Sequence, residues 1–224
     1  MRYKVAIRFA VQDDVRFISH HDMMRLFERA LARTQLPVRF SEGFNPRPKL
    51  SLPLPRPVGI ASTADVLVVE FTGPMDPQEA LRQLAAQMPG SVTLEEAWIP
   101  PGQRPMQPES ATYSLELPAD QVAPVGERIG VLLQASNWPI RRSDSESEPG
   151  KELDLRSYLL HAGIEGRRLS WTVRISGGGT IRPSEFLAAV GLDPAQWHHR
   201  VCRTAIAWRT QAPAGPEPHS PADE

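Results

Sequence analysis

Residues 3–34, YKVAIRFAVQDDVRFISHHDMMRLFERALART, place a strand directly before a capped amphipathic helix and so decide the fold. The start of this stretch alternates apolar side chains with others, which is typical of a strand with one buried face. In residues 20–34 the apolar side chains recur at helical spacing, and Ser19 stands at the expected N-cap with Asp22 three residues on. A strand followed by a helix that covers it is the opening step of an α+β sandwich.

The same strand-to-helix step recurs along the chain. Before residue 100 we predict strands at 3–10, 49–60, 65–72 and 92–99, a short strand at 37–41, and helices at 20–34 and 77–88. After residue 111 we predict strands at 112–117, 169–176 and 201–208, extended segments beside the polar run at 141–152, and helices at 120–136 and 184–190. Two successive βαββαβ units predict an α+β fold of two tandem ferredoxin-like sandwiches with mostly antiparallel sheets.

The 23 prolines mark how the chain is divided. A cluster at 100–108 separates the two periodic regions and is interpreted as a linker, and the proline-containing tail has no large apolar side chain to bury. We therefore expect an N-terminal unit at 1–100, a linker at 101–111, a C-terminal unit at 112–210 and a disordered tail at 211–224.

Charge is distributed unevenly along a chain whose formal net charge is −1. Residues 1–60 hold 11 basic and 5 acidic residues, whereas residues 61–140 hold 3 and 10. A basic segment within a nearly neutral protein indicates either a localised anionic ligand or an ordinary solvated face.

A stripe of ionisable side chains runs along the helix at 20–34. Its members are four residues apart: His21, Arg25, Arg29 and Arg33. Like charges at this spacing destabilise an isolated helix slightly. The stripe is therefore either a solvated face, with Glu28 as a compensating acid, or a set of guanidinium groups that contact phosphates, for which their planar fork is suited.

The loop at 41–49, SEGFNPRPK, adds a second basic element. Its turn-forming residues are Gly43, Asn45, Pro46 and Pro48. Glycine permits a positive φ, and the two prolines hold their neighbours extended and exclude a helix. In such a run Arg47 and Lys49 project to the same side, which predicts a rigid basic finger. Phe44 beside them either stacks on a base of single-stranded nucleic acid or packs into the core.

Three strings stand in order near the N-terminus: RFISHHDMMR at 16–25, FERAL at 27–31 and LPVRFSEGFNPRPK at 36–49. They resemble the signature of the radical-SAM-linked bacterial family, which carries a domain of unknown function found alone or at the C-terminus of radical-SAM proteins. The later run Ile181-Arg182-Pro183-Ser184 resembles that family's arginine-proline helix entry. Where the family commonly has Leu before Ser-His and a single His, this chain has Ile18 and the pair His20-His21. The resemblance implies no established activity, but it implies a radical-SAM enzyme as a partner.

Cys202 is the single cysteine of the chain and cannot supply the three thiolates of a radical-SAM cluster, so this chain is not that catalyst. It also cannot form an internal disulfide. Adjacent histidines on a helix point about 100° apart, so His20, His21 and Asp22 are not predicted to bind a metal. Helix capping explains Ser19 and Asp22 more simply than a catalytic triad does. We predict no cofactor, no metal site, no membrane span and no secretory signal, and hence a soluble cytoplasmic protein.

The leading hypothesis is a noncatalytic module that binds transfer or ribosomal RNA and acts beside a radical-SAM modification enzyme. Its candidate RNA-binding residues are Arg16, Arg25, Arg29, Arg33, Phe44, Arg47 and Lys49. The rival is a metal-independent RNA-processing enzyme in which His20 or His21 is the general acid or base, because an imidazole titrates near neutral pH. A third hypothesis is a protein-interaction adaptor that binds its enzyme partner without RNA.

Overall fold

The structure is a computed structural model and describes residues 3–142, 150–177 and 179–209. The first half of the chain carries β1 (Tyr3–Val11), the 3-10 helix η1 (Asp13–Phe17), α1 (His20–Leu31), β2 (Leu50–Ser51), β3 (Ala61–Phe71), α2 (Pro77–Ala85) and β4 (Val92–Trp98). The second half carries β5 (Pro108–Glu116), α3 (Ala119–Gln134), β6 (Pro139–Arg142), β7 (Lys151–Asp154), α4 (Leu155–Tyr158), β8 (Leu159–Glu165), β9 (Arg168–Arg174), α5 (Pro183–Ala189), α6 (Pro194–Trp197), the 3-10 helix η2 (His198–Arg200) and β10 (Cys202–Trp208). The predicted tail lies outside the described residues.

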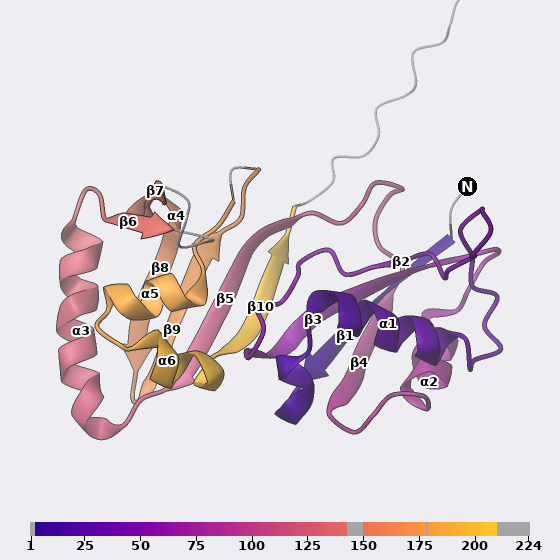
Figure 1. Ribbon diagram of the computed structural model, residues 1–224, viewed down its shortest axis with the longest axis horizontal. Coiled ribbons are helices and arrows are strands. Elements are labelled where there is room, and N and C mark those ends of the chain that lie inside the picture. Colours follow the sequence, from indigo (N-terminus) through magenta and orange to yellow (C-terminus); the bar gives the residue numbers. More distant parts are fainter. Residues whose placement is uncertain (1–2, 143–149, 178, 210–224) are drawn as a thin grey trace, which may run out of the picture.

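One large sheet runs through both halves (Figure 1). Its strands lie in the order β4-β1-β3-β10-β5-β9-β8, and β2 also pairs with β3. Within this sheet the paired strands are antiparallel, apart from β3 and β10, which are parallel and join the two halves. The fold is therefore mixed α+β around a mostly antiparallel sheet, and β6 and β7 form a separate hairpin.

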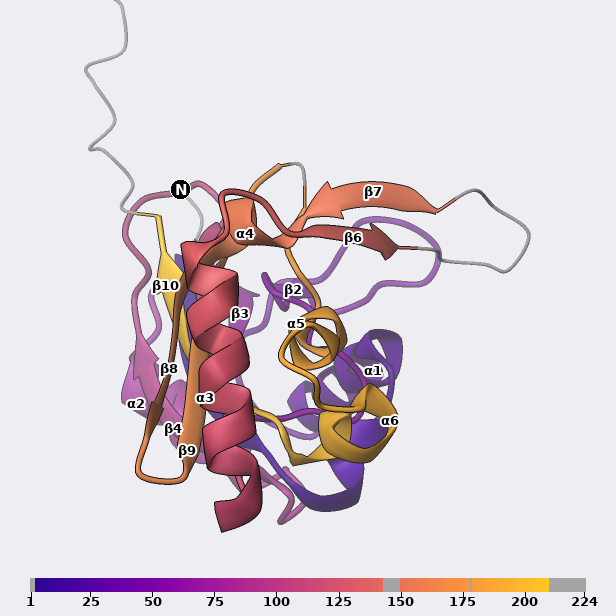
Figure 2. The same ribbon diagram turned by 90° about the vertical axis from the view of Figure 1, so that its left-hand side faces the viewer.

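Helices cover one face of the sheet. Figure 2 shows α1, α3, α5 and α6 on the same side of it. In the first half, α1 and α2 bury an apolar core against β1, β3 and β4, in which the Phe9 and Phe27 rings meet edge to face at 4.9 Å. In the second half, Trp171 stacks on Tyr113 at 5.6 Å and on Phe186 at 4.5 Å. Each such aromatic pair adds about 0.5–1.5 kcal/mol beyond its buried area.

Local signals in the sequence explain where helices begin. The Ser19 side chain accepts a hydrogen bond from the Asp22 backbone N–H at 3.1 Å, so Ser19 is the N-cap of α1. Pro183 occupies the first position of α5, where a missing N–H is harmless. The first helix ends at Leu31, before the predicted Thr34, because the Thr34 N–H and hydroxyl both donate to the Leu31 carbonyl.

The predicted strand at 49–60 is wrong for most of its length, since only Leu50–Ser51 forms a strand. Pro53, Pro55 and Pro57 follow, and proline has no N–H to donate to a ladder. The predicted strand at 37–41 is reduced to isolated bridges at Val38 and Phe40. Conversely β3 begins at Ala61, before the predicted residue 65, because its first residues pair with β10. Strand β5 begins at Pro108, within the segment predicted as a linker.

Candidate nucleic-acid interface

A groove of about 610 Å³ lies at the sheet edge formed by β2. Binding sites for small ligands commonly enclose ~300–1,000 Å³, so one nucleotide unit fits this size. Its walls come from segments far apart in the sequence: α1, the loop at 41–49, β1 to β3, and the loop at 100–106. The groove is therefore a product of the tertiary fold and not of one motif.

The loop at 41–49 is a narrow paired finger. The Ser41 N–H donates to the Arg47 carbonyl at 2.8 Å, and the Arg47 N–H donates back to the Ser41 hydroxyl at 3.0 Å. The Lys49 N–H donates to the Arg39 carbonyl at 2.7 Å. Arg47, Pro48 and Lys49 all line the groove, so the finger presents both of its cations to the same space.

The tip of the finger carries Phe44, whose side chain is fully exposed at 105 %. The interpretation of Phe44 as a core residue is therefore wrong. Gly43 beside it adopts a φ of +136°, which a side chain would strain. Asn45 and Pro46 are also exposed. An exposed ring on a paired loop is available to stack on a planar ligand.

Cationic side chains outnumber acidic ones in the groove. The cations are Lys4, Arg47, Lys49 and Arg104, and the acids are Glu28 and Glu70. No ion pair to Arg47 or Lys49 occurs among residues 3–142, 150–177 and 179–209. The Lys4 ammonium donates to the Gln103 carbonyl at 2.7 Å, so part of the predicted linker packs on the sheet and walls the groove.

The basic stripe lies on the exposed side of the first helix and just beyond its end. Its members His21, Arg25, Arg29 and Arg33 are all exposed. Met24 and Glu28, each one residue before a stripe arginine, line the groove, so the stripe begins about 100° further round α1. Arg25 approaches Asp22 at 3.7 Å, but both side chains are 55 % exposed and such a pair contributes little. Neither Arg29 nor Arg33 has an ion pair within the described part of the chain.

Arg16 lies apart from the groove, at the joint between the two halves. Its guanidinium donates to the His199 carbonyl at 3.0 Å and lies 4.9 Å from the centre of the Phe17 ring. The Arg16 carbonyl accepts hydrogen bonds from the Gly59 N–H and the Arg56 guanidinium. The structure thus separates Arg16 from the other predicted RNA-binding residues and gives it contacts that hold the halves together.

A buried charge cluster, which sequence reasoning missed, lies at the same joint. Arg203 is fully buried, and it donates from Nε and Nη2 to one oxygen of Asp65 at 3.1 and 2.7 Å. The Ser62 hydroxyl also bonds to this carboxylate. Asp65 belongs to the first half and Arg203 to the second, so their bond reinforces the short pairing of β3 with β10.

Arg56 adds a second guanidinium to the cluster. Its Nε lies 3.4 Å from the other Asp65 oxygen, and its side chain is only 6 % exposed. It also donates to the carbonyls of Arg16 and Ile60. Burial lowers the pKa of Arg56, the charge of Asp65 opposes this, and Arg203 lowers it further. Two guanidinium groups therefore share one carboxylate, and the cluster formed by Arg56, Asp65 and Arg203 carries a net positive charge.

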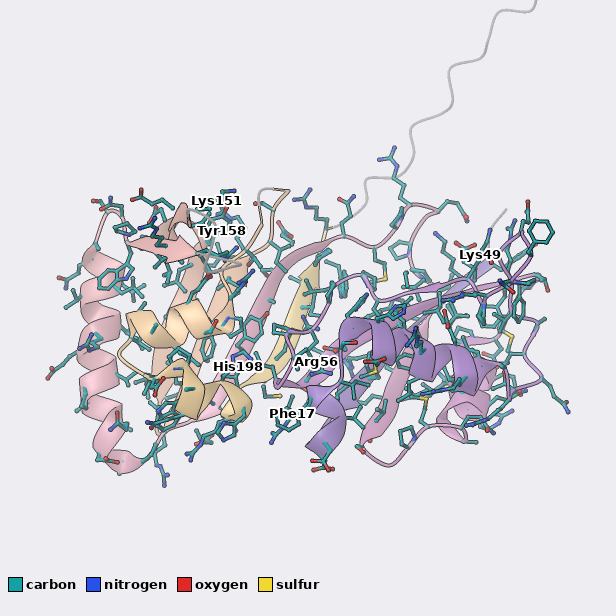
Figure 3. The ribbon with its side chains drawn as sticks, in the orientation of Figure 1. Phe17, Lys49, Arg56, Lys151, Tyr158 and His198 are labelled. Atoms are coloured by element: carbon teal, nitrogen blue, oxygen red, sulfur yellow. The ribbon has the colours of Figure 1, made fainter. Side chains whose placement is uncertain are left out.

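A second, very small cavity touches this cluster. It encloses about 10 Å³, room for about one water, and Ser19, His20, Arg56 and Asp65 contribute to its wall. His21 lies instead on the exposed stripe. Figure 3 shows Arg56, His198 and Phe17 near the joint, and Lys49 towards the far end of the N-terminal half. The groove and the joint are thus separate places, and the two candidate histidines do not share a site.

The open face of the sheet carries a third hollow, of about 450 Å³, between β3 and β10. Trp98 and Trp208 contribute to its walls. Its arginine, Arg8, is paired with Glu95 at 3.1 Å and with Glu96 at 3.3 Å. One cation shared by two carboxylates gives this hollow no positive charge with which to attract phosphate.

The sequence matches the family model described as "Uncharacterized protein conserved in bacteria (DUF2344)" over residues 4–183. The chain belongs to this family. DUF2344 is a family of unknown function in bacteria, as the sequence resemblance led us to expect, and its description names no enzyme partner. The match includes the first helix, the finger and Asp65, and it ends before Arg203.

No curated protein matches this DUF2344 chain. Among solved structures it is similar to a chain of the "Crystal Structure of a Cbf5-Nop10-Gar1 Complex", with 11 % identity and a TM-score of 0.40. The alignment covers 92 % of this chain and 48 % of that one, so the DUF2344 chain spans about half the length of the chain it matches.

Two features are absent from the described parts of this DUF2344 chain. No group of three or more His, Cys, Asp or Glu side chains in those parts could hold a metal ion. No helix there is both long enough and apolar enough to cross a bilayer.

Proposed function

We propose that this DUF2344 protein binds RNA, of the transfer or ribosomal type, through the groove and the adjoining stripe. The observation that carries the proposal is the convergence of Arg47 and Lys49 on one groove, where neither has an ion pair within the described residues. A guanidinium or ammonium that no carboxylate neutralises is available to phosphate oxygens. Arg29 and Arg33 extend the same charge along the exposed side of the helical segment.

The chain would serve as an accessory that holds RNA for a separate radical-SAM modification enzyme. This partner rests on the resemblance of residues 16–49 to the radical-SAM-linked family and on the lack of the three cysteines such an enzyme needs. Crosslinking in the presence of both RNA and the radical-SAM enzyme distinguishes an accessory that holds RNA from an adaptor that binds only the enzyme. Recovery of the enzyme without any RNA would favour the protein-interaction adaptor instead.

We also infer that the two halves are tandem ferredoxin-like units. The strand order β4-β1-β3-β2 in the first half, and β10-β5-β9-β8 in the second, supports this relation. When the strands of the large sheet alone are counted along the chain, the first strand of each half lies next to the fourth, and the third pairs with the first and the second. The β6–β7 hairpin would then be an insertion after α3 of the second unit.

Salt dependence tests the RNA-binding proposal. If Arg25, Arg29, Arg33, Arg47 and Lys49 each meet a phosphate, log Kd should change with log salt with a slope of about 3.5, at ~0.7 per contact for single strands. Affinity would then fall about 100-fold between about 50 and 200 mM salt. Fluorescence anisotropy with labelled tRNA and rRNA fragments measures this slope.

Charge-removal variants locate the contacts. We expect R47A/K49A to reduce the slope to about 2.1, because two phosphate contacts are lost. The matched control R82A/R168A removes two arginine charges at exposed sites outside the groove and should leave the slope unchanged. The RNA-binding proposal would be refuted if log Kd of the wild type did not change with log salt, or if the two double variants had equal slopes.

A second candidate function is metal-independent RNA cleavage by His20. One observation favours it: His20 lines the same small cavity as Ser19, Arg56 and Asp65. The test is incubation of the same RNAs in EDTA. Cleavage that is lost in H20A and retained in H21A would establish His20 as the catalytic residue. RNA that stays intact with the wild type would exclude the cleavage function.

A further inference from the structure

We infer that the groove recognises a guanine base of the bound RNA and that Glu28 is the residue that selects it. This rests on the proposed function, because it assigns a base to the groove whose cations would hold the phosphates. The starting observation is an acidic side chain on the wall of a basic groove. Glu28 is half-buried there, one helical turn after Met24 on α1.

No interaction of the Glu28 side chain within the described part of the protein explains why an acid occupies this position. Its side chain makes no hydrogen bond or ion pair within the described part of the chain, although Arg25 and Arg29 lie within one helical turn of it. Glu70, the other acid of the groove, is already engaged, since it has an interaction within the protein and its backbone bonds to Arg39 and Lys49. Glu28 is thus the carboxylate that the fold leaves for a ligand.

The chemistry of a carboxylate determines which hydrogen-bonding groups the ligand must carry. An ionised carboxylate is an acceptor only, so it repels phosphate and pairs with N–H donors. Guanine offers two adjacent donors on its Watson–Crick edge, the ring N1–H and the N2 amine, which match two carboxylate oxygens. Adenine and cytosine place an acceptor beside their amine, and uracil flanks its N–H with two carbonyls. Recognition of single-stranded RNA commonly uses this edge of an unstacked base.

The rest of the groove suits the remaining parts of a guanine nucleotide. Met24 precedes Glu28 by one turn, and Met106 lines the groove from the loop at 100–106, so apolar atoms are present for the faces of a base. Arg47 and Lys49 supply the charge for the neighbouring phosphate. The volume of about 610 Å³ holds one such unit and not a duplex.

The experiment compares nonamers of uridine that carry guanosine, inosine, adenosine or cytidine at the central position. Inosine keeps the N1–H and lacks the N2 amine, so it separates the two donors. A bidentate pair discriminates by about 5- to 150-fold, so guanosine should bind that much tighter than adenosine, with inosine between them. Anisotropy at fixed salt gives the four dissociation constants.

The variant E28Q tests the residue itself. It keeps the shape of Glu28 and exchanges one acceptor for a donor, so the preference for guanosine should fall to about twofold or less while binding of every nonamer is retained or strengthened. The control E127Q makes the same change at an exposed position of α3 and should keep the preference.

The outcomes distinguish failure of the proposed guanine recognition from failure of RNA binding itself. Salt-dependent binding with equal affinity for the four nonamers, or a guanosine preference that E28Q retains, overturns the role of Glu28 and leaves RNA binding standing. Absence of binding to every nonamer and to the tRNA and rRNA fragments overturns both.

Discussion

Replacement of Asp65 by Asn tests the buried joint most directly. The change keeps the size of the side chain and removes the negative charge that Arg203 contacts at 2.7 and 3.1 Å and Arg56 at 3.4 Å. Both guanidinium groups would then be buried with only neutral oxygens as acceptors. Their other partners are backbone carbonyls, including those of Leu54 and Pro55 for Arg203.

The expected loss follows from this burial. Breaking a buried ion pair by removal of one partner costs about 3–5 kcal/mol of unfolding free energy, because a charge is left uncompensated. We expect the upper part of this range, since one carboxylate serves two cations. For a chain of this length each 1 kcal/mol moves Tm by about 2–4 °C, so a loss of about 4–5 kcal/mol should make D65N melt about 8–20 °C below the wild type. A wild-type stability above about 5 kcal/mol leaves the variant folded at room temperature.

Thermal unfolding followed by circular dichroism measures the shift, and E116Q is its control. Glu116 pairs with Arg168 at 3.0 Å, a distance close to those at Asp65, but the two side chains are 61 % and 68 % exposed. An exposed pair contributes about 0–1 kcal/mol, so E116Q should lower Tm by less than about 4 °C. A D65N variant as stable as E116Q would refute the claim that burial gives the joint its strength.

Three further predictions concern single side chains. Removal of the α1 cap in S19A should cost about 0.5–2 kcal/mol, read from the urea midpoint. Loss of the exposed ring in F44A should leave Tm unchanged and weaken RNA binding by about 1–3 kcal/mol; a lowered Tm would show that Phe44 packs in the fold. Burial raises the pKa of Tyr113 and of the Cys202 thiol above their ordinary values of 10.0 and 9.0. The folded protein therefore keeps protons that the unfolded chain releases, so stability should fall as pH rises above about 9, and urea titrations should show a smaller fall for Y113F above pH about 10.

Much of the fold could be predicted because its signals are local. The capped helix after β1, the proline-led helix α5 and the alternation in the strands are each set by residues within one or two turns. The overestimated strand at 49–60 shows where local patterning fails. Its apolar residues alternate as in a strand, but the prolines remove the N–H groups that a ladder needs, and the chain crosses to the joint instead.

The candidate site likewise contains features that local sequence predicts and features that depend on residues far apart in the chain. The finger could be predicted from the Pro-X-Pro-X spacing, since that spacing fixes where Arg47 and Lys49 point. The joint could not, because Arg203 lies 138 positions from Asp65 and no local pattern links them. A weak signal did exist: Asp65 opens the run DVLVVEF, where a charge beside buried apolar residues calls for a partner. The contact of Arg16 with His199 could not be predicted for the same reason, because His199 lies in the other half.

The described basic residues of segment 1–60 fall into two groups in the structure, those with partners within the protein and those without ion pairs. Arg16 and Arg56 are held by the joint, and Arg8 is shared by two carboxylates. An ordinary solvated face would intersperse both signs of charge along its length. Here cations without ion pairs within the described residues gather instead at the groove and along the adjoining helical segment: Arg29, Arg33, Arg47 and Lys49. This concentration of cations without ion pairs in the described part of the chain favours an anionic ligand over a solvated face. The salt slope of R47A/K49A, compared with that of R82A/R168A, decides between the two.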